Sequence, residues 1–250
     1  MKHVFFMGNK RSGTSILSRV INLHPSVFVF PEADVAWILY CLANGKELGP
    51  YPLDGFTGFR RTMASHEALV RQPFTNIAGH GDALMLALAA ARGRDTAKLE
   101  WIGDKKPVQQ TDPAIFNFLC DLYPEARFVH IVRHPGNFVR SLEKRYAVKN
   151  KGAPPGRDIL YDLWLKAERW VIEDKASKRA PILSVTYPDL LSDPAATATR
   201  VLTFLGLDVS ESLAARIKAA VDPGRDAPYE PSDAEAPAAV QEIARLYGLM

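Results

Sequence analysis

The sequence predicts an α/β fold, in which a parallel sheet carries helices on both faces and residues 1–250 form a single domain. Three short apolar runs support this prediction, because each is followed by a polar or glycine-containing turn and then by a helical pattern. Strands that alternate with helices form parallel sheets, since every crossover helix has to cover one sheet face. The chain, with 250 residues of which 47% are hydrophobic, is long enough to bury one sizeable core.

The first apolar run and the helix after it open the fold. Residues 3–7 are expected to form a buried strand. A helix is expected over residues 14–23, because its apolar side chains recur on one face and it stops before the His24-Pro25 pair. Residues 8–13 between them therefore form a strand-to-helix loop.

The other two strands are expected at residues 127–132 and 182–185. A helix over 112–122 leads into the first of them, and another begins after it near Pro135, a residue suited to a first helical turn. A helix over 158–178 leads into the second. This order repeats the strand–helix alternation of the opening segment.

Glycine and proline mark the irregular parts of the chain. Residues 45–58 and 149–157 contain several of both and are expected to be surface loops. We interpret residues 45–98 as an insertion on the acceptor side of the site. Residues 222–237, rich in Pro, Asp and Glu, are expected to form an irregular loop before a last helix over 238–247.

Charge and composition exclude several classes of function. The net charge of +3 is too small to indicate bulk nucleic-acid binding, although it is compatible with a local anion site. No run of about 18 apolar residues is present, so no transmembrane segment is expected. The opening residues lack a signal-peptide pattern. Cys41 and Cys120 lie among apolar residues and are interpreted as free thiols. We therefore expect a cytoplasmic protein.

The strongest motif is the glycine loop after the first strand, which has the sequence GNKRSGTS at residues 8–15. The N–H groups of such a loop, together with the N-terminus of the next helix, form a cradle for an anion. Its Gly-x-x-x-x-Gly spacing makes the fold P-loop-like, yet Thr14 stands where triphosphate-binding loops have lysine. Lys10 and Arg11 place the positive charge inside the loop instead. This suits one phosphate with an attached group better than a magnesium-bound polyphosphate.

Arg133 and Ser141 indicate a second phosphate site. Arg133 lies just past the C-terminal end of the strand at 127–132, where open α/β sheets bind ligands. Ser141, within the following helix, is expected to reach the same anion. A guanidinium fork together with a hydroxyl can hold a phosphate. A nucleotide that carries separate 5′- and 3′-phosphates needs two such sites.

Taken in order, these motifs resemble those of the sulfotransferases that use 3′-phosphoadenosine-5′-phosphosulfate (PAPS). Residues 11–15 resemble the family's 5′-phosphosulfate loop, and the eight-residue spacing of Arg133 and Ser141 matches its 3′-phosphate motif. The segment YPDLL at 187–191, with FLGL at 204–207, resembles its third conserved region. The matching blocks cover roughly half of the chain.

Within that family, residues 11–32 are most similar to the tyrosylprotein sulfotransferase branch, which they match without a gap. The resemblance implies that Glu32 is the general base and that Lys105 lies near the bridging oxygen of the donor. Lys106 is adjacent, so the sequence leaves open which lysine has this role. Arg11 is implied to bind the 5′-phosphate and to stabilise the group in transfer. The expected donor-binding residues are Lys10, Arg11, Ser12, Gly13, Thr14, Ser15, Arg133, Ser141 and Tyr187.

The resemblance implies an enzyme that moves a sulfuryl group from PAPS to an acceptor hydroxyl by in-line transfer, releases adenosine 3′,5′-bisphosphate and uses no metal. The acceptor is left open among a small molecule, a sugar, a lipid and a peptide tyrosine, and the oligomeric state is also open. Two alternatives remain at this point. One is a P-loop-type kinase that uses ATP, which the missing lysine disfavours. The other is a non-catalytic nucleotide-binding module, which the pairing of Glu32 with Lys105 disfavours.

Overall fold

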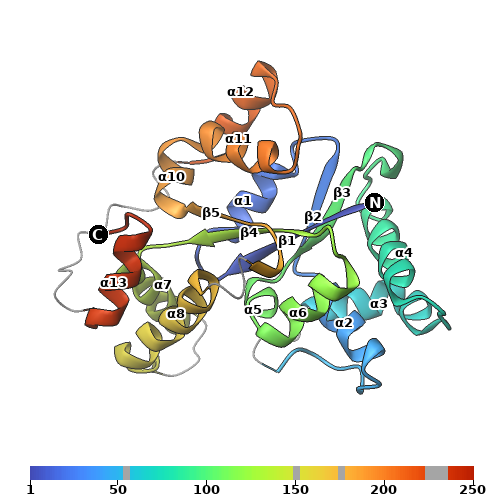
Figure 1. The fold of residues 1–250 in the computed structure, drawn as a ribbon, viewed down its shortest axis with the longest axis horizontal. Coiled ribbons are helices and arrows are strands. Elements are labelled where there is room, and N and C mark those ends of the chain that lie inside the picture. The colour runs from blue at the N-terminus through green and yellow to red at the C-terminus, as the bar shows by residue number, and fades with distance from the viewer. Residues whose placement is uncertain (53–56, 149–152, 174–177, 223–235) are drawn as a thin grey trace.

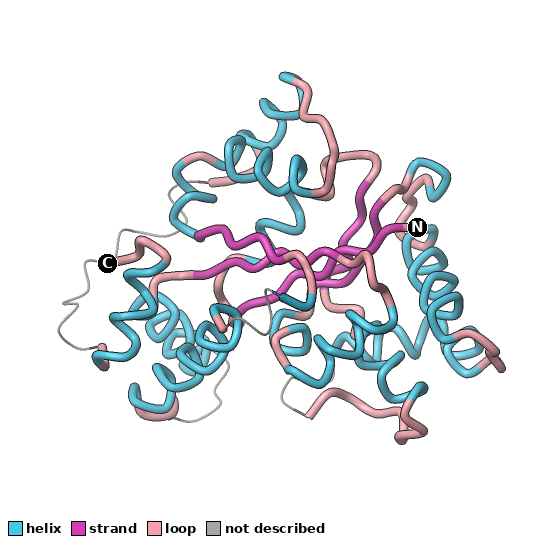
Figure 2. The backbone as a smooth tube through the Cα atoms, viewed as in Figure 1, coloured by secondary structure: helices cyan, strands magenta, loops and turns pink. Residues whose placement is uncertain are grey.

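The computed structural model describes residues 1–52, 57–148, 153–173, 178–222 and 236–250. A five-stranded parallel sheet in the order β2-β3-β1-β4-β5 forms its centre (Figure 2). The strands are β1 (Lys2–Gly8), β2 (Val27–Pro31), β3 (Trp101–Lys105), β4 (Arg127–Val132) and β5 (Ile182–Thr186). The expected α/β architecture is therefore confirmed, with β1 at the middle of the sheet.

Helices cover both faces of the sheet, as Figure 1 shows. One face carries α1 (Thr14–Ile21), α10 (Tyr187–Ser192), α11 (Pro194–Phe204) and α12 (Glu211–Ala219). The other carries α2 (Val35–Ala43), α3 (Thr57–Arg71), α4 (Ile77–Ala90), α5 (Pro107–Gln110), α6 (Pro113–Leu122), α7 (Pro135–Val148), α8 (Arg157–Ile172) and α13 (Ala238–Leu246). A short 3₁₀ turn at Thr96–Lys98 precedes β3.

The packing of β1 explains why residues 4–7 within it are all apolar. Val4 and Phe6 pack into the core beneath α1 and α11, whereas Phe5 and Met7 pack into the core beneath α2, α4 and α6. Because successive side chains of a strand point to opposite faces, a strand covered on both sides needs apolar residues at every position. The central strand is therefore the clearest one in the sequence.

Two of the five strands, β2 and β3, were absent from the sequence-based prediction. The β2 run VFVFP is short enough to be mistaken for part of a buried helix. The β3 run WIGDK contains glycine, Asp104 and Lys105, which are unusual in a buried strand, yet all five residues are buried. A Cβ on Gly103 would lie 1.6 Å from the Val4 carbonyl oxygen of the neighbouring strand, so only glycine permits this close approach.

The region at 45–98 is more ordered than expected. Residues 46–51 lie outside helices and strands, but α3 and α4 then form part of the helical layer on one sheet face (Figure 1). The helix predicted over 158–178 is observed as α8, which ends at Ile172. The predicted loops at 149–157 and 222–237 lie partly outside the described residues. Among the helices of the described chain, none combines the length and the apolar character that crossing a membrane requires.

Candidate active site

The candidate residues gather at one edge of the sheet, where all five parallel strands end. The glycine loop leaves β1, and Glu32 follows β2 directly. Lys105 is the last residue of β3, Arg133 follows β4, and Tyr187 follows β5. The strand order changes direction at β1, which pairs with β3 on one side and with β4 on the other. Ligands of open α/β sheets bind at such a switch point.

The glycine loop has the backbone conformation of an anion cradle. Arg11 and Gly13 have positive φ angles of 68° and 96°, and α1 begins immediately afterwards at Thr14. The N–H groups in the first turn of a helix have no acceptor within the helix, so they face the loop. The Ser12 hydroxyl is fully buried and has no hydrogen-bond partner among the described residues. The loop therefore offers several donors to one anion.

The two phosphate motifs lie side by side, as the sequence predicted. A guanidinium nitrogen of Arg133 donates to the Arg11 carbonyl oxygen at 2.8 Å. The Arg11 Nε donates to the Ser141 hydroxyl at 3.0 Å. Arg133 is 7% exposed, although it lies in a polar loop. A ligand that contacts the glycine loop can thus reach Arg133 and Ser141 as well.

Tyr187 lines the same region from β5. The Arg133 guanidinium lies over the Tyr187 ring, 4.8 Å from its centre. The ring also packs against Gly13, where an added Cβ would lie 2.2 Å from its Cδ2 atom. The Tyr187 ring is therefore enclosed between the glycine loop and Arg133, and glycine at position 13 is required by both space and backbone angle.

Replacing Gly13 with alanine is expected to remove binding of adenosine 3′,5′-bisphosphate. The methyl group would collide with Tyr187, and alanine disfavours the positive φ, at a cost of about 1–3 kcal/mol for such a strained residue. The shift in melting temperature caused by the nucleotide measures binding. Gly45→Ala is the matched control, because Gly45 also has a positive φ (59°) but has open space around its Cβ position. Nucleotide binding by Gly13→Ala equal to that of the wild type would contradict the assigned role of the loop.

Lys105 joins the glycine loop to Glu32. Its ammonium donates to the Ser15 hydroxyl at 3.0 Å and to Glu32 Oε1 at 2.7 Å. The Lys105 side chain is 2% exposed and that of Glu32 is 48% exposed. A buried cation therefore lies between the glycine loop and a carboxylate that is open to solvent.

The other lysine of the motif, Lys106, has a different position. Its ammonium lies 3.0 Å from Asp34, and both side chains are buried. Gln109 also donates to Asp34. Burial raises the pKa of the Asp34 carboxyl, and the Lys106 charge opposes that rise. Lys106 thus belongs to the support beneath the site, and Lys105 is the lysine beside the loop.

A buried carboxylate holds the turn that carries Glu32. Glu32 and Asp34 have positive φ angles of 62° and 60°, which non-glycine residues adopt rarely. Asp104 accepts hydrogen bonds from the N–H groups of Ala33 at 3.1 Å and Val35 at 3.0 Å. These two bonds stabilise the strained turn and aim Glu32 at Lys105.

Stability is expected to decrease between about pH 4 and pH 7 because of Asp104. Burial raises the pKa of Asp104 from 3.8 to about 7; the Asp34 charge adds to the rise, and the N–H groups of Ala33 and Val35 and the Lys106 charge oppose it. Between these two values the folded chain retains a proton that the unfolded chain has released. The free energy of unfolding therefore falls as the pH rises through this window and levels off above it.

Urea denaturation at pH 5 and pH 8 measures this effect. Asp104→Asn cannot titrate at that position, so its free energy of unfolding should fall less between the two pH values than that of the wild type. Asp34 remains in both proteins and leaves a common contribution. An equal fall in the two proteins would show that Asp104 is not the source.

Sequence reasoning did not identify the supporting polar groups. Asp34 and Asp104 each lie within two residues of a predicted site residue, and their position at strand ends is the signal that was available.

A second support lies under the glycine loop. Asn9 donates to Glu168 at 2.8 Å, and Glu168 Oε2 lies 2.9 Å from His130 Nε2. No sequence pattern links Glu168, on α8, to a loop 159 residues earlier.

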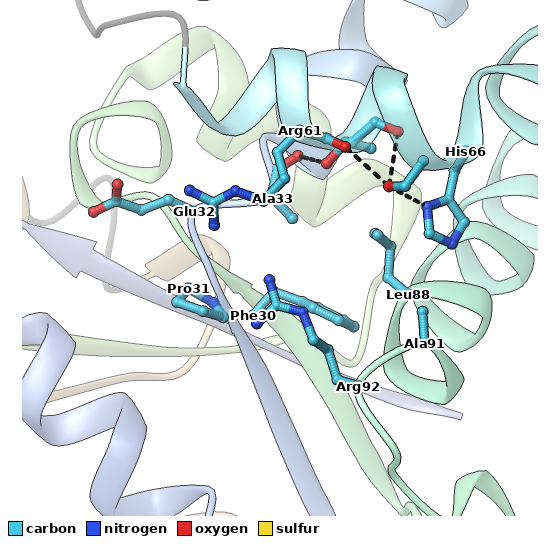
Figure 3. A pocket seen from close by; sticks show the side chains of 11 residues that line it. Phe30, Pro31, Glu32, Ala33, Arg61, His66, Leu88, Ala91 and Arg92 are labelled. Atoms are coloured by element: carbon cyan, nitrogen blue, oxygen red, sulfur yellow. Dashed lines mark hydrogen bonds between the residues drawn. The ribbon is translucent and has the colours of Figure 1, made fainter.

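A pocket of about 250 Å³ opens beside Glu32 (Figure 3). Its apolar wall is formed by Phe30 and Pro31 at the end of β2 and by Leu88 on α4. Two arginines, Arg61 on α3 and Arg92 after α4, also line it. The pocket connects the site to the region at 45–98.

Comparison with known proteins identifies the protein family to which the chain belongs. Residues 3–211 match the model of the Sulfotransferase family, and the chain belongs to that family. Family membership favours sulfuryl transfer over the ATP-dependent kinase alternative. No curated protein matches the sequence.

Solved structures share the fold at low identity. A sulfotransferase domain from the olefin synthase of Synechococcus PCC 7002 is 18% identical with a TM-score of 0.62, over 99% of this chain and 94% of that one. A sulfotransferase domain of the curacin biosynthetic pathway is 16% identical with a TM-score of 0.60, over 99% and 97%. Sulfotransferase STF9 of Mycobacterium avium is 11% identical with a TM-score of 0.57, over 98% and 75%. The resemblance to the tyrosylprotein branch stays a prediction.

Proposed function

We propose that this sulfotransferase uses PAPS as its donor and transfers the sulfuryl group to an acceptor hydroxyl with Glu32 as general base. The observation that carries the proposal is the position of the Lys105 ammonium, 3.0 Å from the Ser15 hydroxyl and 2.7 Å from Glu32. One cation thus contacts the donor loop and the carboxylate that would take the proton. Donor and acceptor would meet at this point.

The residues of the site suit both ends of the donor. The N–H groups of residues 13–15 and the buried Ser12 hydroxyl would hold the 5′-phosphosulfate. Arg133 and Ser141 would hold the 3′-phosphate, with Tyr187 near the nucleotide. The Arg11 guanidinium and the Ser141 hydroxyl, which are hydrogen-bonded to each other, could each rotate to donate to a phosphate. Arg and Lys side chains would neutralise the isolated phosphates of PAPS without a metal ion.

The chemical step would be an in-line displacement at sulfur. Glu32 takes the proton of the acceptor hydroxyl while the acceptor oxygen forms its bond to sulfur. The bond between sulfur and the bridging oxygen breaks, and its electron pair remains on the 5′-phosphate. Lys105 and Arg11 then stabilise the negative charge that grows on the leaving phosphate. Positioning and electrostatics supply most of the rate enhancement.

The acceptor would enter from the side of α3 and α4. The pocket beside Glu32 is lined by these two helices and by the end of β2. Because part of the pocket lining comes from residues 45–98, this region would shape the binding of the acceptor. This position agrees with the proposed direction of attack, because Glu32 lies between the pocket and Lys105.

A thermal-shift titration tests the donor assignment. Adenosine 3′,5′-bisphosphate should raise the melting temperature at lower concentration than AMP, because only the former carries the 3′-phosphate. ATP with magnesium should have a weaker effect than either. Stronger stabilisation by ATP with magnesium would contradict the proposal. Binding of the bisphosphate without transfer from radiolabelled PAPS to any acceptor would favour the non-catalytic alternative.

A further inference from the structure

The pocket beside Glu32 has an unusual charge. Two guanidinium groups, from Arg61 and Arg92, line it together with the apolar residues of β2 and α4. Figure 3 shows both side chains reaching into the space next to Pro31 and Glu32, one from α3 and the other from the segment after α4. Glu32 is the only carboxylate among the described lining residues, and its carboxylate already lies against Lys105. The pocket therefore carries an excess of positive charge.

Arg61 and Arg92 differ from those exposed arginines of the protein that pair with a carboxylate. Arg71, Arg157 and Arg179 each form an ion pair with a nearby carboxylate. No carboxylate of the described chain lies within ion-pair distance of Arg61 or Arg92. Arg92 follows the last turn of α4, where a cation complements the helix dipole, and this explains in part why a cation stands there without a carboxylate partner. It does not account for Arg61, which lies well inside α3.

We propose that the acceptor carries a negatively charged group, a carboxylate or a phosphate, which Arg61 and Arg92 bind while its hydroxyl lies at Glu32. This inference rests on the proposed function and names the chemical class of its acceptor. Planar guanidinium groups match both carboxylate and phosphate oxygens, and an arginine fork can hold either one with two hydrogen bonds. Two arginines on opposite sides of a pocket form a clamp for such a group.

The size of the pocket sets the kind of acceptor. A volume of about 250 Å³ lies just below the range of about 300–1,000 Å³ that is typical of ligand sites. Phe30 and Leu88 offer apolar contact in the same pocket. The pocket thus suits a short hydroxylated acid, with the hydroxyl and the anion separated by a few carbon atoms.

Matched probes test the charge of the acceptor. One set is 4-hydroxyphenylacetate, 4-hydroxyphenylacetamide and tyramine, and a second is 4-hydroxybutyrate, 4-hydroxybutyramide and 4-aminobutanol. Within each set the hydroxyl is the same and the far group is anionic, neutral or cationic. 4-Hydroxybenzylphosphonate distinguishes a phosphate-like group from a carboxylate. Transfer from radiolabelled PAPS gives kcat/KM, and ligand-observed NMR with the nucleotide-loaded protein gives binding without turnover.

We expect the anionic member of at least one set to be preferred over its amide by about tenfold or more, because a hydrogen bond to a charged group contributes on this scale. Arg61→Ala and Arg92→Ala should each remove most of that preference and leave the amide unaffected. Arg71→Ala is the matched control, since Arg71 lies on the same helix but pairs with Glu67 outside the pocket. The nucleotide-induced thermal shift should be unchanged in all three variants.

Three results would overturn the inference. The first is a preference for the amide or the amine in both transfer and NMR binding. The second is an anion preference that survives in the Arg61→Ala/Arg92→Ala double variant. The third is a loss of nucleotide binding in these variants, which would assign the two arginines to the donor. Failure of the proposed function looks different: no transfer to any probe, with anion-selective NMR binding still present and dependent on both arginines.

Discussion

Glu32→Gln is expected to lower the rate of sulfuryl transfer by about 10²–10⁴-fold, the usual contribution of a general base. Glutamine has nearly the same shape and can still accept a hydrogen bond from Lys105, but it cannot take the proton of the acceptor hydroxyl. Binding of adenosine 3′,5′-bisphosphate should not weaken, because the proposed mechanism places Glu32, a partner of Lys105, on the acceptor side. Steady-state kinetics with radiolabelled PAPS and calorimetry with the bisphosphate give the two values.

Two companion variants separate this role from a structural one. Glu32→Asp keeps the carboxylate but shortens its reach, so it should retain more activity than Glu32→Gln. Glu67→Gln changes an exposed glutamate on α3 that contacts Arg71, and it should leave transfer unchanged. Turnover of Glu32→Gln equal to that of the wild type would remove Glu32 from the mechanism.

Lys105→Met is the second change with a large expected effect, a loss of about 10²–10³-fold in kcat, as for removal of one group that stabilises transition-state charge. Methionine fills the buried stem of the lysine but supplies no charge to the leaving phosphate. The protein should stay folded, because Glu32 is half exposed and remains hydrated without its partner. Single-turnover kinetics separates this loss in chemistry from any change in donor affinity.

Lys106→Met, in contrast, should lower the free energy of unfolding rather than slow the chemical step. Its partner Asp34 has a fully buried side chain, so removing the lysine leaves an uncompensated charge, at a cost of about 3–5 kcal/mol in the free energy of unfolding. The exposed Lys98→Met serves as a control for both variants. If Lys106→Met lost transfer while remaining as stable as the wild type, the two lysines would have been assigned the wrong way round.

The sequence was sufficient to predict β1, β4 and β5, where an apolar run is followed by a turn and then by a helical pattern. After one basic residue at its start, each of β1 and β4 is apolar except for one histidine and the final Gly8 of β1, and both were predicted nearly to their ends. β3 was missed because it carries Asp104 and Lys105, whose burial depends on contacts that include those with Ala33, Val35 and Glu32. Those contacts come from a turn about 70 residues away, which no local pattern reveals.

Of the candidate site, the residues at strand ends could be predicted from the sequence, whereas the two pocket arginines could not. The glycine loop and the pair formed by Arg133 and Ser141 follow strands, and strand ends of a parallel sheet meet at one edge. Their closeness was thus a consequence of topology, and the Arg11–Ser141 contact confirms it. The clamp of Arg61 and Arg92 had no such signal, because it depends on how α3 and α4 pack beside β2. Tertiary packing alone brings those two arginines together.

A crystal structure with adenosine 3′,5′-bisphosphate is the most direct test of the central claim, that one nucleotide spans the glycine loop and the Arg133–Ser141 pair. We expect the 5′-phosphate against the N–H groups of residues 13–15 and the 3′-phosphate within hydrogen-bond distance of Arg133 and Ser141. A nucleotide bound away from the loop, or a 3′-phosphate that contacts neither Arg133 nor Ser141, would contradict it.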